Sequence, residues 1–198
     1  MPAMPRCYLF HGPASKIARM HPAISDVLAG LDRSREQLRA AVDAVPKQLR
    51  DERPASDRWS VAHILEHLAL VEERLTASLA AKLADAREAG LGREEGEPSL
   101  LSPELRVRIV DRSERRQAPD PLQPHGGIGH EAAWERAETA RAAFRLLVTR
   151  ADGLALGGVI HEHPRFGALN LYQWGGFLAA HETRHTEQIR EISGALQS

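Results

Sequence analysis

The sequence lacks the features that would tie the protein to an oxidising compartment or to a membrane. Its 198 residues include one cysteine, Cys7, so no disulfide can form within the chain and the fold cannot depend on an oxidising environment. No apolar run approaches the ~20 residues needed to cross a bilayer. The N-terminal letters MPAMPRCYLFHGP also lack the continuous apolar core of a signal peptide. These absences predict a cytoplasmic protein in which Cys7 is an incidental thiol.

The sequence also has no excess of charge of either sign. The 26 lysines and arginines nearly balance the 27 aspartates and glutamates. Such a chain has no basic field of the kind that attracts phosphate backbones, so nucleic acid is not an expected partner. No internal repeat or low-complexity block is present. A hydrophobic content of 42% predicts one core and therefore one domain over residues 1–198, with a loose N-terminal segment at 1–22.

Apolar residues recur at three- and four-residue spacing in four segments, which is the pattern of amphipathic helices. These segments cover approximately residues 23–45, 60–90, 130–151 and 170–196. Ser60 is the expected N-cap of the second helix, and Asn170 and Gln173 have the spacing of a cap and its reciprocal partner at the start of the fourth. The segments between the helices have almost no convincing strand pattern. The sequence therefore predicts an all-α fold, an antiparallel four-helix bundle.

The connection between the second and third helices, residues 91–127, is too long for a simple turn. Five of the twelve prolines fall in it, together with many charged residues. Connections of this length without regular structure are usually functional or disordered, so we expect either a lid over a site or a solvated excursion. The alternation of Leu105, Val107 and Ile109 predicts a short extended piece within it.

Two histidines of the last helix indicate a metal site. At about 100° per residue, His181 and His185 fall within roughly 30° of the centre of that helix's apolar stripe, so both face the core. Burying two imidazoles without compensation is costly, and the i, i+4 spacing places them one above the other, as in helical metal sites. The histidines in predicted loops or at helix ends are given no role: His11, His21, His125, His130 and His161.

Two other metal sites that share part of this pattern are disfavoured. The letters HETRH at 181–185 match the zinc-protease pattern, in which Glu182 would be the general base. The extended protease signature, however, needs glycine and histidine where this chain has Gln188 and Glu191, and too little chain follows for a downstream third ligand. A di-iron carboxylate bundle would need a second Glu-x-x-His element, and the sequence has none.

The third ligand is therefore expected on the second helix, which carries His63 and His67. His67 lies about 80° from the centre of the apolar stripe, at the flank of the core, whereas His63 lies about 120° away and faces outward. We expect His67 to be the ligand and His63 to be exposed, with a place at the mouth of the site or behind a ligand as the alternatives. Three neutral imidazoles leave positions on the ion for water or substrate, as in catalytic sites.

Two motifs resemble the DinB-like superfamily. WSVAHILEH (59–67) resembles the family's Trp-Ser-Val entry into helix two, and HETRHTEQI (181–189) resembles its paired helix-four histidines. HPRFGALNLYQW (163–174) is similar to the His-Pro-x-x-Gly approach to the last helix in one large branch. In this pattern Trp59 is a packing anchor and Ser60 a cap.

The resemblance implies a four-helix bundle, often homodimeric, with one ion of the nickel, zinc or manganese type. Its ligand positions match His67, His181 and His185, while His63 inherits no role. Glu66 and Glu182 are sequence neighbours of ligands, but adjacent helix positions point about 100° apart, so we expect both to be solvated or behind the ligands rather than on the ion.

The functions implied by the resemblance fall into three classes. Bacillithiol S-transferases and mycothiol-dependent isomerases would share coordination of a small thiol at the open metal position, which would present a thiolate to an electrophile. Hydrolases would activate metal-bound water. Our leading expectation is a metal-dependent thiol S-transferase for electrophilic small molecules, with a low-molecular-weight thiol as co-substrate. The alternatives are a metal-dependent hydrolase and a non-catalytic metal-binding stress protein.

Overall fold

The computed structural model describes residues 20–114 and 117–196, and Cys7 and His11 lie outside them. Four long helices form the body of this part of the chain, and they agree with the predicted helices to within a few residues. They are α1 (Pro22–Asp43), α2 (Val61–Glu88), α4 (His130–Arg150) and α5 (Leu171–Leu196). The prediction of an all-α fold is confirmed. Among the described residues, no helix is both long and apolar enough to cross a membrane.

The predicted caps form as hydrogen bonds at the starts of α2 and α5. The Ser60 hydroxyl accepts the backbone N–H of His63 at 3.3 Å. At the entry to α5, the backbone N–H of Asn170 donates to the Gln173 side chain, and the backbone N–H of Gln173 donates to the Asn170 side chain, each at 2.9 Å. Both helices therefore begin where the capping residues place them.

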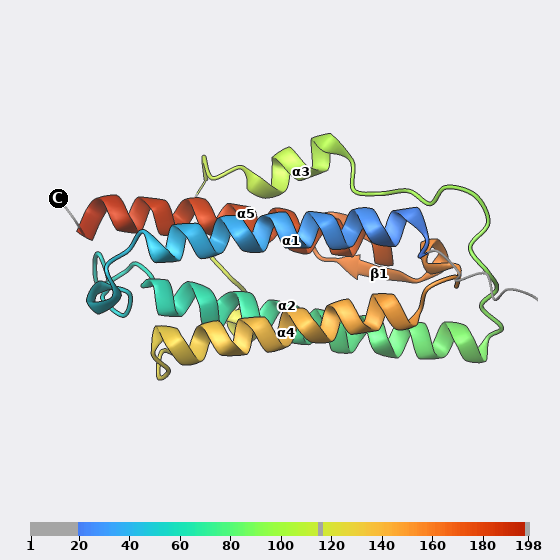
Figure 1. Cartoon of the computed structure of the whole chain (residues 1–198), viewed down its shortest axis with the longest axis horizontal. Helices are drawn as coiled ribbons and strands as arrows, with labels where there is room; N and C mark the ends of the chain where they lie inside the picture. The colour runs from blue at the N-terminus through green and yellow to red at the C-terminus, as the bar shows by residue number, and fades with distance from the viewer. Residues whose placement is uncertain (1–19, 115–116, 197–198) are drawn as a thin grey trace, which may run out of the picture.

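The long helices pack as two pairs that run in opposite directions (Figure 1). α1 packs mainly on α5, and α2 packs mainly on α4. The long crossover returns the chain to the end of the bundle where α2 began, so α2 and α4 run in the same direction, as do α1 and α5. α1 runs antiparallel to α2, and α4 runs antiparallel to α5; the connections within these two pairs do not include the crossover. The crossover thus decides which helices become parallel neighbours.

The expected extended piece at Leu105, Val107 and Ile109 is wrong, because this segment is a short helix, α3 (Pro103–Val110). Ser102 caps it by accepting the backbone N–H of Leu105 at 3.2 Å, and Pro103 suits a first helical turn. Leu105 and Ile109 are four residues apart and share the face that packs toward α5, whereas Val107 is 68% exposed. The apparent alternation was a helical i, i+4 pair interrupted by an exposed valine.

A small hairpin precedes α5 and was not predicted. β1 (Ile160–His163) pairs antiparallel with β2 (Gly167–Asn170) in a register that sets Ile160 opposite Asn170. At its turn, Nδ1 of His163 accepts the backbone N–H groups of Arg165 and Phe166 at 3.0 and 3.3 Å. Three short 3-10 helices complete the regular structure of the described residues: η1 (Lys47–Leu49), η2 (Asp120–Leu122) and η3 (Leu156–Gly158).

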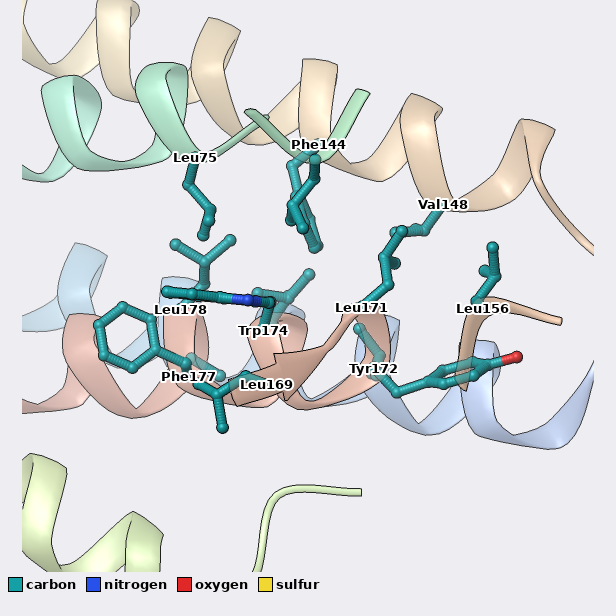
Figure 2. Packing of buried hydrophobic residues seen from close by; sticks show 14 of the residues in the cluster. Leu75, Phe144, Val148, Leu156, Leu169, Leu171, Tyr172, Trp174, Phe177 and Leu178 are labelled. Carbon is teal, nitrogen blue, oxygen red and sulfur yellow. The ribbon is translucent and has the colours of Figure 1, made fainter. Parts of the chain in front are cut away.

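The interior of the bundle consists of two apolar clusters separated by a charged layer. The larger cluster joins Leu75 of α2 and Phe144 of α4 to Trp174 and Leu178 of α5, and Figure 2 shows these side chains pointing toward one another. The smaller cluster lies nearer the start of α2 and includes Ile64. Between the clusters all four long helices place polar side chains in the core: Ser34, Arg35, Glu72, Arg141 and Glu182.

Ion pairs connect the charged layer in the middle of the bundle. Arg141 lies 2.6 Å from Glu72 and 3.2 Å from Glu182, and Arg35 lies 2.8 Å from Glu182. Burial raises the pKa of Glu72 although the two arginines oppose the shift. Burial would lower the pKa of Arg141, but the Glu72 and Glu182 carboxylates outweigh it and raise that pKa. Each buried charge in the layer is therefore compensated by a partner on another helix.

A close contact between α1 and α5 predicts the effect of a glycine substitution. A Cβ on Gly175 would lie 2.4 Å from Cγ1 of Val27, so Gly175→Ala should lower the free energy of unfolding by about 1–3 kcal/mol, the usual cost of overpacking. Gly194, on the same helix, has no atom within 4 Å of such a Cβ, and Gly194→Ala should stabilise by up to about 1 kcal/mol. Urea unfolding followed by circular dichroism measures both, and equal effects would contradict the contact.

Candidate metal centre

Three histidines from two helices converge in the structure as predicted. One ring nitrogen from each of His67 on α2 and His181 and His185 on α5 can be chosen so that all lie within 4.8 Å of one another. His67 is 4% exposed and His185 is 7% exposed, while His181 keeps partial access to solvent. His67 lies deeper than the flank position expected from its helical angle. Such a cluster of imidazoles can hold one metal ion.

Hydrogen bonds fix the tautomers of two of these imidazoles. Nδ1 of His67 lies 2.7 Å from the backbone carbonyl of Leu122 in the crossover, and because a carbonyl only accepts, Nδ1 carries the proton. Nδ1 of His185 likewise donates to the amide oxygen of Gln188 at 2.9 Å. Both rings therefore keep the lone pair on Nε2. Outer partners of this kind orient ligating histidines and make them more basic.

The distances between the nitrogen atoms fit a shared ion. Nε2 of His181 lies 3.2 Å from Nε2 of His185. Two nitrogens on one tetrahedral zinc, each bonded at about 2.0–2.1 Å, lie about 3.3 Å apart. The donor set and its spacing thus suit a divalent metal ion. The cluster contains no carboxylate among the described residues.

Aromatic rings hold the imidazoles in place. Trp59 packs against His67 with ring centroids 5.0 Å apart and against His185 at 6.3 Å. Phe177 stacks on His181 at 5.5 Å with an interplanar angle of 13°. Trp59 is indeed a packing anchor, as expected, and the residues on which it packs are two of the candidate ligands.

The three imidazoles are neutral at physiological pH. Burial lowers the pKa of His67, and the hydrogen bond to Leu122 offsets this only in part. The pKa values of His181 and His185 are lowered further, first by burial and then by the neighbouring imidazoles. Neutral imidazole is the form that binds a metal, so the folded protein presents the three rings ready to coordinate.

The histidine cluster opens onto a cavity of about 1290 Å³. The cavity lies between α2 and α5 and is bounded by the end of the crossover and by the β1–β2 hairpin. Side chains that define its walls are Trp59, Leu122, His163, Phe166, Trp174 and Gln188. Drug-sized ligands occupy pockets of about 300–1,000 Å³, so a small molecule can reach the cluster. The end of the crossover thus forms part of the cavity wall, and the expectation of a lid stays a prediction.

The remaining acidic and histidine candidates lie elsewhere. Glu182 is 1% exposed and belongs to the charged layer rather than to the cavity lining, so it is neither solvated nor placed as the general base of a protease. Glu66 is 4% exposed and is likewise not solvated. The expectation of an exposed His63 is wrong, because this side chain is partly buried and its Nδ1 lies 2.6 Å from the Ser60 hydroxyl.

Two further histidines of the cavity wall were missed or dismissed by sequence reasoning. His161 and His163 both line the cavity from β1. They are two residues apart, and His163 is the first residue of the HPRFG motif; this spacing was the available signal for a strand that presents both side chains on one face. Burial lowers the pKa of His163 to about 4, with smaller effects from Arg165 and His161, so this ring is also neutral at pH 7.

The fold and the cluster together define a four-helix bundle with a candidate three-histidine metal centre in its interior. The family model for the DinB superfamily matches residues 30–189, so the chain belongs to the DinB superfamily. A Bacillus subtilis (strain 168) protein, YuaE, which is described as uncharacterized, is 24% identical over 149 residues that cover 74% of this chain and 85% of YuaE. No solved structure matches the chain.

The metal affinities of single His→Ala variants should distinguish the ligands from histidines that do not bind the ion. His67→Ala, His181→Ala and His185→Ala should each weaken metal binding by more than the about 10- to 100-fold that is typical when only an outer partner is lost. His63→Ala should retain tight binding and lose far less affinity than these three variants, because His63 lies outside the cluster. Competition against a chromophoric chelator measures the affinities. Equal loss in all four variants would contradict the assignment.

The lowered pKa values predict how the stability of the metal-free protein depends on pH. In the unfolded chain each imidazole takes up a proton near pH 6.5, whereas burial delays this uptake in the folded state. The unfolded state therefore binds more protons as the pH falls below about 6.5, and the free energy of unfolding should decrease.

Urea unfolding between about pH 7.5 and pH 5.5 should reveal this decrease. His185→Leu should show a shallower decrease, because one of the buried imidazoles is gone while the others, including His163, remain. A stability that stays constant over this range would show that the folded protein takes up the same protons as the unfolded chain.

Proposed function

We propose that the protein binds one divalent metal ion through His67, His181 and His185 and transfers a low-molecular-weight thiol to an electrophilic small molecule. The observation that carries this proposal is that three neutral imidazoles meet at the wall of a large open cavity. A closed structural site would need four protein ligands, and the cluster supplies three. An ion held there keeps a position for an exogenous ligand.

The residues around the cluster support an exogenous nucleophile. The single cysteine, Cys7, is far from the cluster in sequence and lies outside the described residues. No carboxylate belongs to the cluster, and Glu191 of the cavity lining is engaged by Arg112 at 3.0 Å. Among the described residues, the cluster itself therefore contains neither a cysteine nor a carboxylate. A bound divalent ion would supply the missing activation by favouring the thiolate form of a coordinated thiol.

The chain's own contribution is to position the thiol and the electrophile. Trp59 and Phe177 pack against the imidazoles and hold them in fixed orientations, so the three rings would hold an ion at a fixed place in the cavity wall. Trp174 and Phe166 form apolar walls on the hairpin side of the cavity, where water is excluded from part of a bound substrate. Holding two reactants in one cavity can account for much of the rate enhancement of such a transfer.

Thiol binding should depend on the metal. A small thiol should bind the metal-loaded protein in preference to the metal-free protein, and binding should release a proton because the anion coordinates. Cobalt substitution gives a sulfur-to-metal charge-transfer band as the direct readout. Single-turnover conjugation to a model electrophile should then require the ion.

Cys7→Ser provides the background for these measurements, because it removes the only protein thiol that could exchange with the added one. His181→Ala in that background should abolish both the absorption band and the conjugation. Metal-dependent cleavage of esters or amides, with no response to any thiol, would reject thiol transfer and indicate hydrolysis by metal-activated water. Metal binding with neither activity would indicate a non-catalytic role.

A further inference from the structure

The end of the crossover is attached along α2 beside the candidate metal centre. We call residues 120–126 the strap. The carbonyl of Leu122 accepts from Nδ1 of His67 at 2.7 Å, and the carbonyl of Pro121 accepts from Arg74 at 3.3 Å. His67 precedes Arg74 along α2, whereas its partner Leu122 follows Pro121 along the strap, so the strap runs antiparallel to α2. The strap therefore supplies the acceptor that orients the α2 ligand.

One carboxylate holds the other end of the strap. Oε1 of Glu66 accepts the backbone N–H of His125 at 3.2 Å, and Oε2 accepts that of Gly126 at 3.1 Å. Glu66 is 4% exposed, so both oxygens are used in an environment that penalises an unpaired charge. Nη1 of Arg136 lies 4.0 Å from Oε1 of Glu66. A carboxylate that accepts two backbone N–H groups fixes a loop more firmly than neutral partners do.

The strap also fits closely against α2 at Gly126. This residue has φ +65°, and a Cβ on it would lie 2.7 Å from Nε2 of His63. Any larger residue would have to move the strap away from the helix or displace His63. The partly buried His63 thus forms part of the surface on which the strap rests, which explains why it is not exposed.

We propose that Glu66 is a positioning residue of the metal centre: it holds the strap so that the Leu122 carbonyl stays on Nδ1 of His67. Glu66 belongs to neither the cluster nor the cavity lining, and it acts through the backbone of residues 122–126. The inference rests on the proposed metal binding. It explains why a carboxylate is buried beside a ligand without coordinating the ion.

Glu66→Gln tests the contact from the side of the helix. The amide has one acceptor oxygen, so one of the two strap N–H groups loses its partner. Metal affinity should fall by about 10- to 100-fold, the range observed when outer partners of metal ligands are removed. Glu73→Gln is the matched control, because Glu73 lies on α2, binds Arg136 at 2.7 Å and does not bind the strap backbone; its metal affinity should equal that of the wild type.

Gly126→Ala tests the same contact from the side of the strap and leaves Glu66 intact. It should weaken metal binding in the same direction, because the new Cβ collides with His63. Gly127→Ala is its control, since a Cβ there meets nothing within 4 Å, and it should bind metal normally. The glycine pair decides the question if Glu66→Gln does not fold.

The decisive readout is the exchange of individual imidazole protons in the cobalt-substituted protein, observed as shifted signals by proton NMR. Exchange of the His67 Nδ1–H with water should accelerate in Glu66→Gln and Gly126→Ala. Exchange of the His185 Nδ1–H, which is bonded to Gln188 on its own helix, should stay unchanged and serves as the internal reference.

Metal affinities within twofold of the wild type in both Glu66→Gln and Gly126→Ala would overturn the inference. Equal acceleration of both imidazole signals would also overturn it, because that result indicates general loosening rather than loss of the strap. A wild-type protein that binds no divalent ion would instead refute the proposed function, and this is measured before any variant is compared.

Discussion

Compensation of charge in the middle of the bundle is the constraint on which the rest of the structure depends. Glu182 is 1% exposed, and Arg35 and Arg141 lie against its side chain and form ion pairs with it. These partners come from α1 and α4, so the pairs fix the rotation of α5 relative to both helices. With Glu182 turned toward the charged layer, its neighbour His181 is turned about 100° away, toward the cavity. The ion pairs thereby determine the direction in which the candidate ligands face.

The histidine cluster satisfies the same constraint in a different way. In the part of the chain that the structure describes, its rings are buried or partly buried and lie next to no carboxylate, and burial keeps them neutral. One nitrogen from each ring lies within 4.8 Å of the others, and a cation held between these nitrogens would satisfy them. The charged layer and the cluster occupy neighbouring levels of the bundle: the charged layer balances its charges within the protein, and the cluster could bind a cation from outside.

Much of this arrangement follows from the sequence because helical periodicity encodes direction. The caps at Ser60 and Asn170 and the inward angles of His181 and His185 depend only on local spacing, and the structure agrees with each. The α3 helix was missed because two apolar residues four apart can look like alternation when a third, exposed one lies between them. The hairpin, the burial of His63 and the role of Glu66 depend on contacts with the distant crossover, which local spacing does not encode.

The crossover has a further consequence for the mechanics of the bundle. It makes α2 a close partner of α4 and leaves α2 and α5 with few direct contacts. The candidate ligands come from these two weakly connected helices, so an ion shared by His67 and His185 would act as a cross-link. That cross-link closes a loop containing the whole crossover, α4 and the hairpin. Closing so long a loop removes much of the conformational freedom of the unfolded chain. The ion would then stabilise the folded protein as well as take part in the chemistry.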